Sequence, residues 1–186
     1  MVPLTSLWIP ILLSAAIVFV ASSILHMVLP LHRGDLRSIP NEDQARQAIR
    51  ALNIPPGDYA MPHAGSPEAM KDPAFLAKMR EGPVLFMTVV PPGRLSFGPR
   101  LAQWFVYSIV VSVFAAYIAG RALGPGVGYP HVFRFAGTSA FLCYAMALPQ
   151  HSIWYHRSWG TTVRSMIDGL LYGLLTGGTF GWLWPR

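Results

Sequence analysis

The residue best suited to chemistry in this chain is Asp168, a carboxylate inside an otherwise apolar segment near the C-terminus. It is the only acidic residue outside residues 30–100. Ionisable groups in apolar spans are costly and often mark an ion or proton path. Arg164 lies one helical turn before it and Tyr172 one turn after it. We therefore expect Asp168 either to pair structurally with Arg164 or neighbouring hydroxyls, or to hold an ion, a proton or a ligand.

Four histidines lie at the ends of apolar segments, on the predicted membrane face of Asp168: His26, His32, His151 and His156. Imidazoles and a carboxylate at one depth suit a divalent transition metal, and two imidazoles suit the axial positions of haem. No single helix carries an HxxxH or HxxE pattern, so such ligands must converge from separate segments. The alternative is that these histidines are solvated at the membrane interface, where "HSIWYHRSW" has the composition of an aromatic and basic anchor.

Other chemical signals are weaker. Thioethers are soft copper ligands, and residues 61–87 contain Met61, His63, Met70, Met79 and Met87. Their irregular spacing favours packing, because methionine is a common core filler. The chain contains none of the GxSxG, Walker, GxGxxG or HExxH patterns, so no enzyme class is indicated.

The elements that must position these residues are apolar helices. The chain is 53% hydrophobic and only 12% charged, whereas soluble domains are about 25% charged. Four segments approach the roughly 20 residues that a spanning helix needs: 6–29, 101–123, 130–149 and 161–184. We predict an all-α membrane protein, a four-helix transmembrane bundle with a small α+β extramembrane insertion between helices 1 and 2.

The predicted insertion covers residues 30–100. Its "NEDQARQAIRAL" stretch predicts a helix over 42–52, capped by Asn41 with Gln44 as the partner in a capping box. A second helix is predicted over 73–81, beginning at Asp72 and Pro73. The β-branched and aromatic run after Gly82 predicts a strand over 84–90, for which "DYAMP" is the nearest partner strand.

Glycines recur every four residues in the last span, and we name Gly169, Gly173, Gly177 and Gly181 the glycine ladder. Small residues of this kind let helix backbones approach closely in membranes. Two other spans offer matching small residues: Ser108, Ser112, Ala116 and Gly120 in the second, and Ser139, Cys143 and Ala147 in the third. The ladder faces either its own bundle or a second copy of the chain.

A polar stripe follows a second side of the same helix: Ser165, Asp168, Tyr172, Thr176 and Thr179. It lies about a third of a turn from the ladder, since each residue advances roughly 100° around a helix. The last helix therefore has two sides that face protein, and its leucines and Ile167 are left for lipid.

The net charge of +6 comes mostly from arginine, without the basic and aromatic cluster typical of nucleic-acid binding. We expect the lipid bilayer as a partner and no nucleic acid. The side that carries residues 30–100 and 150–160 has the basic excess, which favours a cytoplasmic position for it and termini outside. Near the helix ends this side has Arg33, Arg37, Arg94, Arg100, Arg157 and Arg164, against Arg121, Arg134 and Arg186 on the other side. The chain resembles small bacterial inner-membrane proteins with four spans, which implies a multi-pass protein of that membrane.

Three functions are consistent with these features. The first is a non-catalytic accessory or assembly subunit that binds a membrane-protein partner or forms a homo-oligomer. The second is a small ion or solute transporter or channel component that uses Asp168 and the polar stripe. The third is a haem- or metal-binding redox protein that uses the histidines.

Overall fold

The computed structural model of the chain describes residues 1–93 and 96–186, so that Arg94 of the basic set lies outside it. The described residues form two compact units. The helical unit contains Met1–Arg37 and Phe97–Arg186, and the second unit contains Ser38–Ser96. The second unit is smaller than the predicted insertion, because residues 30–37 belong to the helical unit.

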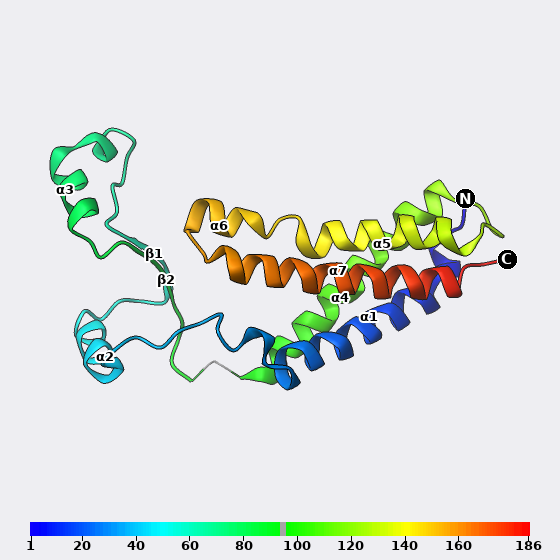
Figure 1. The fold of residues 1–186 in the computed structure, drawn as a ribbon, viewed down its shortest axis with the longest axis horizontal. Helices are drawn as coiled ribbons and strands as arrows, with labels where there is room; N and C mark the ends of the chain where they lie inside the picture. Colours follow the sequence, from blue (N-terminus) through cyan, green and yellow to red (C-terminus); the bar gives the residue numbers. More distant parts are fainter. Residues whose placement is uncertain (94–95) are drawn as a thin grey trace. The chain divides into compact units, whose positions relative to one another are not determined.

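The helical unit consists of short and long helices whose bounds largely follow the apolar segments. Before the second unit it has η1 (Leu4–Leu7), α1 (Trp8–Ser23), the π-helical turn η2 (Ile24–Val28) and η3 (Pro30–His32). After the second unit it has α4 (Phe97–Ala122), α5 (Tyr129–Ala145), α6 (Pro149–Tyr155) and α7 (Trp159–Trp182). The stretch 150–160, expected as a connection, is largely helical, because Pro149 starts α6 at a position that suits proline. Both chain termini lie at the same end of this unit (Figure 1).

Among the described residues, three helices are long and apolar enough to cross a membrane: Leu4–Val28, Phe97–Ala122 and Tyr129–Tyr155. The protein is thus mostly helical with membrane-helix candidates, as the sequence predicts. The last segment, α7, has 24 residues but is not among these three, since glycine, threonine, Arg164 and Asp168 dilute its apolar character.

The glycine ladder lies against α5 of the same chain, and Figure 1 shows the two helices side by side. A Cβ added at Gly173 would lie 2.9 Å from the Gly137 carbonyl oxygen, and one at Gly177 would lie 2.7 Å from the Phe133 carbonyl oxygen. Real Cβ atoms do not approach backbone oxygens so closely, so only glycine permits this helix spacing. The α5 contact is made through Gly137 and its neighbours, whereas Cys143, expected on the packing face, is exposed.

The small residues of α4 pack against the N-terminal segment and not, as their matching spacing indicates, against the glycine ladder. Ser112 accepts a hydrogen bond of 3.0 Å from Ser14 of α1. A Cβ at Gly120 would lie 2.6 Å from the Val2 carbonyl oxygen, and the Val2 amide donates to the Gly120 carbonyl at 2.8 Å. The stripe of Ser108, Ser112, Ala116 and Gly120 is buried. It therefore brings α4 close to the N-terminal segment, while α5 occupies the glycine ladder.

The second unit contains the predicted elements. Helix α2 (Glu42–Ala51) and helix α3 (Pro73–Glu81) match the predicted helices, and the Asp72 carboxylate accepts from the Ala74 amide at the start of α3. Strand β1 (Gly57–Met61) pairs antiparallel with β2 (Leu85–Val89), which confirms the predicted partner. The capping box at Asn41 is wrong: Asn41 has a left-handed backbone with φ of 53° and its side chain caps nothing.

None of the residues that the structure describes in the second unit is buried. A domain of about 60 residues has a marginal core in general, because so much of its surface stays exposed. This unit therefore has little hydrophobic stabilisation of its own.

Candidate functional site

Two of the predicted histidines and Asp168 come together, and we name His26, His32 and Asp168 the His–Asp cluster. His26 lies in the π-helical turn that follows α1, and His32 ends η3 after the proline at residue 30. Asp168 projects from α7 and is only 6% exposed. Two consecutive elements after α1 supply the histidines, and the distant helix α7 supplies the carboxylate, so the ligands come from separate segments as the lack of a single-helix motif requires.

The ligand atoms of the His–Asp cluster all lie within 4.8 Å of one another. His32 Nε2 is 2.9 Å from Asp168 Oδ2, and His26 Nε2 is 3.6 Å from the same oxygen. The two imidazole rings stack with 4.1 Å between their centroids and an interplanar angle of 30°. Both rings therefore present their Nε2 atoms to one carboxylate.

Asp35 fixes the orientation of His32 from the other side. His32 Nδ1 lies 2.7 Å from Asp35 Oδ2. Arg164 donates from Nε to Asp35 Oδ1 at 3.0 Å and also donates to Oδ1 from Nη2. A carboxylate that accepts from Nδ1 places the proton of a neutral imidazole there, and leaves the lone pair on Nε2. We infer that the lone pair of His32 Nε2 faces Asp168.

The contact between His32 and Asp168 is close without being a hydrogen bond. Both His32 Nε2 and Asp168 Oδ2 are buried, and neither has a hydrogen-bond partner in the described structure. Buried polar atoms are nearly always satisfied. With the His32 proton on Nδ1, a nitrogen lone pair and a carboxylate oxygen 2.9 Å apart repel each other unless a second proton or a metal cation lies near both. The cluster is thus a candidate cation site.

The pKa of Asp35 reflects its two partners. Burial raises this pKa, but the hydrogen bonds from His32 and Arg164, together with their charges, lower it more strongly, to about 2. Asp35 therefore remains ionised at neutral pH, as an acceptor for His32 Nδ1 must.

Acid should remove the stabilisation that Asp35 provides. Its pKa in the folded chain is below that of the unfolded chain, so its contribution is complete above the unfolded value of about 4 and is lost as pH falls toward 2. The melting temperatures of the wild type and Asp35→Asn should accordingly differ at about pH 6 and converge toward about pH 2 to 3. Thermal unfolding in detergent over this pH range measures the two melting temperatures. A difference that is unchanged at low pH would contradict the role of Asp35.

Arg164 does not pair with Asp168, which corrects one structural role expected for it. Its guanidinium binds Asp35, 129 residues away in the sequence. Tyr172 does not satisfy Asp168 either, since its hydroxyl is buried without a hydrogen-bond partner. The Tyr172 ring instead packs against Tyr144 and Trp104, with centroid distances of 5.3 Å and 6.0 Å.

The other two predicted histidines lie elsewhere. His151 is on α6, where its ring centroid is 6.1 Å from that of Tyr155. His156 ends α6 in a left-handed conformation with φ of 53°. Neither belongs to the group of ligand atoms found among the described residues.

Sequence reasoning missed Asp35, which it assigned to the insertion. The spacing of His32 and Asp35, three residues apart in "HRGD", is the signal that could have identified the pair. That signal is weak without the fold, because only the return of residues 30–37 to α7 brings Arg164 to Asp35.

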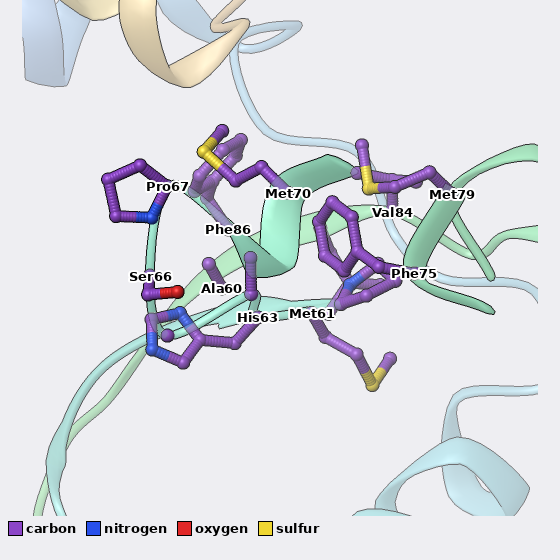
Figure 2. Close-up of a pocket in the computed structure, with 14 residues that line it drawn as sticks. Ala60, Met61, His63, Ser66, Pro67, Met70, Phe75, Met79, Val84 and Phe86 are labelled. Atoms are coloured by element: carbon purple, nitrogen blue, oxygen red, sulfur yellow. The ribbon is translucent and has the colours of Figure 1, made fainter. Parts of the chain in front are cut away.

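Three methionines of the second unit, Met61, Met70 and Met79, line a cavity of about 430 Å³ together with His63, Phe75 and Phe86, whereas Met87 does not line it. Figure 2 shows Met70 and Met79 on one side of this cavity, while the Met61 side chain points away on the other. A copper site requires sulfur atoms that converge on one point. The arrangement is typical of apolar packing, the role that the irregular spacing favours.

The chain has no match among protein-family models, and no curated protein or solved structure is significantly similar to it. Its function must therefore be inferred from the His–Asp cluster and the helices that carry it.

Proposed function

We propose that this protein is a multi-pass integral membrane protein with a divalent transition-metal site in its His–Asp cluster. The observation that carries the proposal is the contact between His32 Nε2 and Asp168 Oδ2, which are 2.9 Å apart, buried and without hydrogen bonds. A metal ion bound by both atoms satisfies both and removes their repulsion.

The distances support a shared ion. Two ligand atoms that are each about 2.1 Å from one ion lie about 3.0 Å apart at a right angle and about 3.4 Å apart at the tetrahedral angle. The separations of 2.9 Å and 3.6 Å from Asp168 Oδ2 are close to these values. Asp35 is the outer carboxylate that orients a ligating histidine, an arrangement common at metal sites.

The ligand set indicates the kind of ion and its availability. Imidazole and carboxylate without thiolate suit zinc or ferrous iron. Three protein ligands leave coordination positions open, as in sites where the metal binds water or substrate. The His26 side chain is 47% exposed, so an external ligand can approach from its side. The cluster therefore fits a metal that acts on an exogenous ligand better than a purely structural ion.

The histidine pair does not suit haem. Axial imidazoles bind iron from opposite faces of the porphyrin, whereas the rings of His26 and His32 stack at 4.1 Å and point to the same carboxylate. We therefore favour a non-haem ion within the metal-binding function.

We further propose that α7 is the fourth span of a transmembrane bundle. Its 24 residues extend about 36 Å, enough to cross the hydrocarbon core. Asp168, Tyr172, Thr176 and Thr179 are buried toward the protein, and Ile167 and Leu174 are exposed. This division matches a membrane helix with polar groups turned inward, and a bacterial inner membrane is the location we propose for it.

Labelling of single cysteines tests the four-span topology. In a Cys143→Ser background, cysteines placed at Ser66 and Ser158 should react with a membrane-impermeant maleimide from the same side of intact vesicles. If α4 and α5 both cross the membrane, the chain crosses it twice between Ser66 and Ser158, so both residues lie on the same side. Reaction from opposite sides would exclude the proposed bundle.

Cobalt binding tests the metal site directly. The protein is purified through a tag without histidines and placed in lipid nanodiscs. It should bind about one equivalent of Co²⁺ and then show visible d–d absorption, which should disappear when Zn²⁺ replaces the Co²⁺. Binding that does not saturate near one equivalent would contradict the proposal.

One observation favours a second role, that of an accessory subunit. The second unit has no buried residue in its described part, although it exposes apolar side chains such as Leu52 and Phe86. A partner that covers these side chains would supply the burial that the unit lacks. Co-purification of a stoichiometric membrane protein in mild detergent would support this role.

A further inference from the structure

A polar cavity of about 590 Å³ opens beside the His–Asp cluster, between residues 31–37 and the first turns of α7. It is lined by Asp35, Arg37, Ser158, Gly160, Thr161 and Arg164, with Leu31 on its wall. All of these residues belong to the helical unit. None of them is a proposed metal ligand.

Several hydrogen-bond donors of this cavity are not used within the described structure. Arg164 binds Asp35 through Nε and Nη2 and approaches Thr161 through Nη2, which leaves Nη1 without a partner. Arg37 forms no ion pair among the described residues. The Ser158 side chain does not cap α7.

Gly160 keeps open the space between two of these donors. A Cβ at this position would lie 3.6 Å from Arg164 Nη1 and 3.6 Å from Ser158 Oγ. A group that occupies this space is therefore in contact range of a guanidinium and a hydroxyl at once. The amides of the first turn of α7 add a positive partial charge at the same end.

The charges define the ligand as an anion. The charge of the Asp35 carboxylate is balanced by its ion pair with Arg164. Arg37 then remains as an unpaired positive charge on the cavity wall. Guanidinium groups bind phosphate oxygens with paired N–H donors, and a tetrahedral phosphate can accept from several directions.

We propose that this cavity binds a phosphate group, that of an anionic phospholipid headgroup. The candidate span of α1 ends at Val28, only three residues before Leu31, which is 52% exposed and gives the cavity an apolar wall for the rest of a lipid. Basic pockets between the ends of transmembrane helices are known places for acidic headgroups. This site is independent of whether the His–Asp cluster holds a metal.

Lipid binding to the full-length chain tests the site. Protein in detergent is titrated with phosphatidylglycerol or phosphatidylcholine, and bound lipid is counted by native mass spectrometry. We expect one phosphatidylglycerol to be retained preferentially. Arg37→Gln should weaken this binding by about tenfold or more, the size expected for one charge-assisted hydrogen bond. Gly160→Ala should also weaken it, because the added methyl group occupies the space between Arg164 Nη1 and Ser158 Oγ. The controls are Arg121→Gln, whose arginine lies over the Tyr117 ring at the other end of α4, and Gly98→Ala, where a Cβ meets nothing within 4 Å.

A second arm separates lipid from free phosphate. Inorganic phosphate at millimolar concentration should displace the lipid weakly and should not raise the melting temperature by itself. If phosphate alone protects the wild type but not Arg37→Gln, the site takes a soluble phosphate and the lipid assignment is wrong. If Arg37→Gln and Gly160→Ala retain phosphatidylglycerol as well as the two controls do, the site itself is refuted. Cobalt binding by the same variants shows separately whether the His–Asp cluster is intact.

Discussion

Replacing His32 with alanine should abolish tight metal binding, with zinc affinity reduced by more than 100-fold. His32 is the ligand whose ring orientation is fixed by a hydrogen bond, because its Nδ1 lies 2.7 Å from Asp35 Oδ2 and its Nε2 is left for the ion. Asp168→Asn should have a comparable effect, since the amide keeps the shape of the carboxylate and removes its charge. Asp35→Asn should cost less, about 10- to 100-fold, as expected for an outer partner of a ligating histidine. Competition with a chromophoric chelator measures all of these affinities.

His151→Ala is the matched control for this series, because His151 lies on α6 outside the cluster and should leave affinity unchanged. Thermal unfolding of the same samples shows whether each variant is folded. If His32→Ala does not fold, the isosteric Asp168→Asn variant replaces it in the test. Equal affinities for the wild type, His32→Ala and Asp168→Asn would eliminate the metal site. An equal loss on His151→Ala would place the ion elsewhere.

Substitution within the glycine ladder should give the largest loss of stability. A Cβ at Gly177 would lie 2.7 Å from the Phe133 carbonyl oxygen and 3.0 Å from the Gly137 Cα, both backbone atoms of α5. Gly177→Ala must therefore push the two helices apart, at a cost typical of overpacking, about 1–3 kcal/mol. Gly177→Leu places three further carbons in the same contact and should cost more or prevent folding. Thermal unfolding in detergent, followed by circular dichroism, gives the comparison.

Gly178 provides the control from the same helix and the same residue type. A Cβ there would lie 3.5 Å from the Tyr129 hydroxyl, an ordinary contact with the end of a side chain. Gly178→Ala should be neutral or stabilising, because alanine exceeds glycine in helix propensity by about 1 kcal/mol. Leu174→Ala, on the exposed side of α7, should likewise cost little. If Gly177→Ala and Gly178→Ala have the same melting temperature, the close contact with α5 is wrong.

The elements governed by local rules could be predicted from the sequence. Helix α3 follows from Asp72 as a cap and Pro73 at the first helical position, and the β1–β2 pair follows from a β-branched run with one available partner. The capping box failed because Asn41 adopts a left-handed conformation, in which its side chain does not reach the helix amides.

Which helices touch could not be predicted from spacing alone. Small residues recur every four positions in both α4 and α7. This periodicity indicates that each helix has a close neighbour but does not identify which helix that is. The structure pairs α7 with α5 through Gly137, whose neighbours four positions before and after, Phe133 and Phe141, are large, so that α5 shows no matching ladder of small residues there. It pairs α4 with the N-terminal segment through Ser14 and Val2.

The candidate site was only half accessible to sequence reasoning. His26, His32 and Asp168 could be selected, since histidines and an acid are rare near apolar segments. The sequence could not show that His151 lies outside this group, because that depends on how the helices pack in three dimensions. Asp35 was overlooked because residues 30–37 carry no helical or strand periodicity, yet they return to α7 through the ion pair of Asp35 with Arg164.

The ion pair between Asp35 and Arg164 also joins parts of the chain that are 129 positions apart in the sequence. A covalent link across so long a loop would also restrict the unfolded chain, as disulfides are thought to do, whereas an ion pair acts only in the folded chain. This chain has one cysteine and cannot form a disulfide within itself. A metal bound by His32 and Asp168 would serve as a removable cross-link in the folded chain, and would make the attachment of residues 26–32 to α7 stronger when the cell supplies metal.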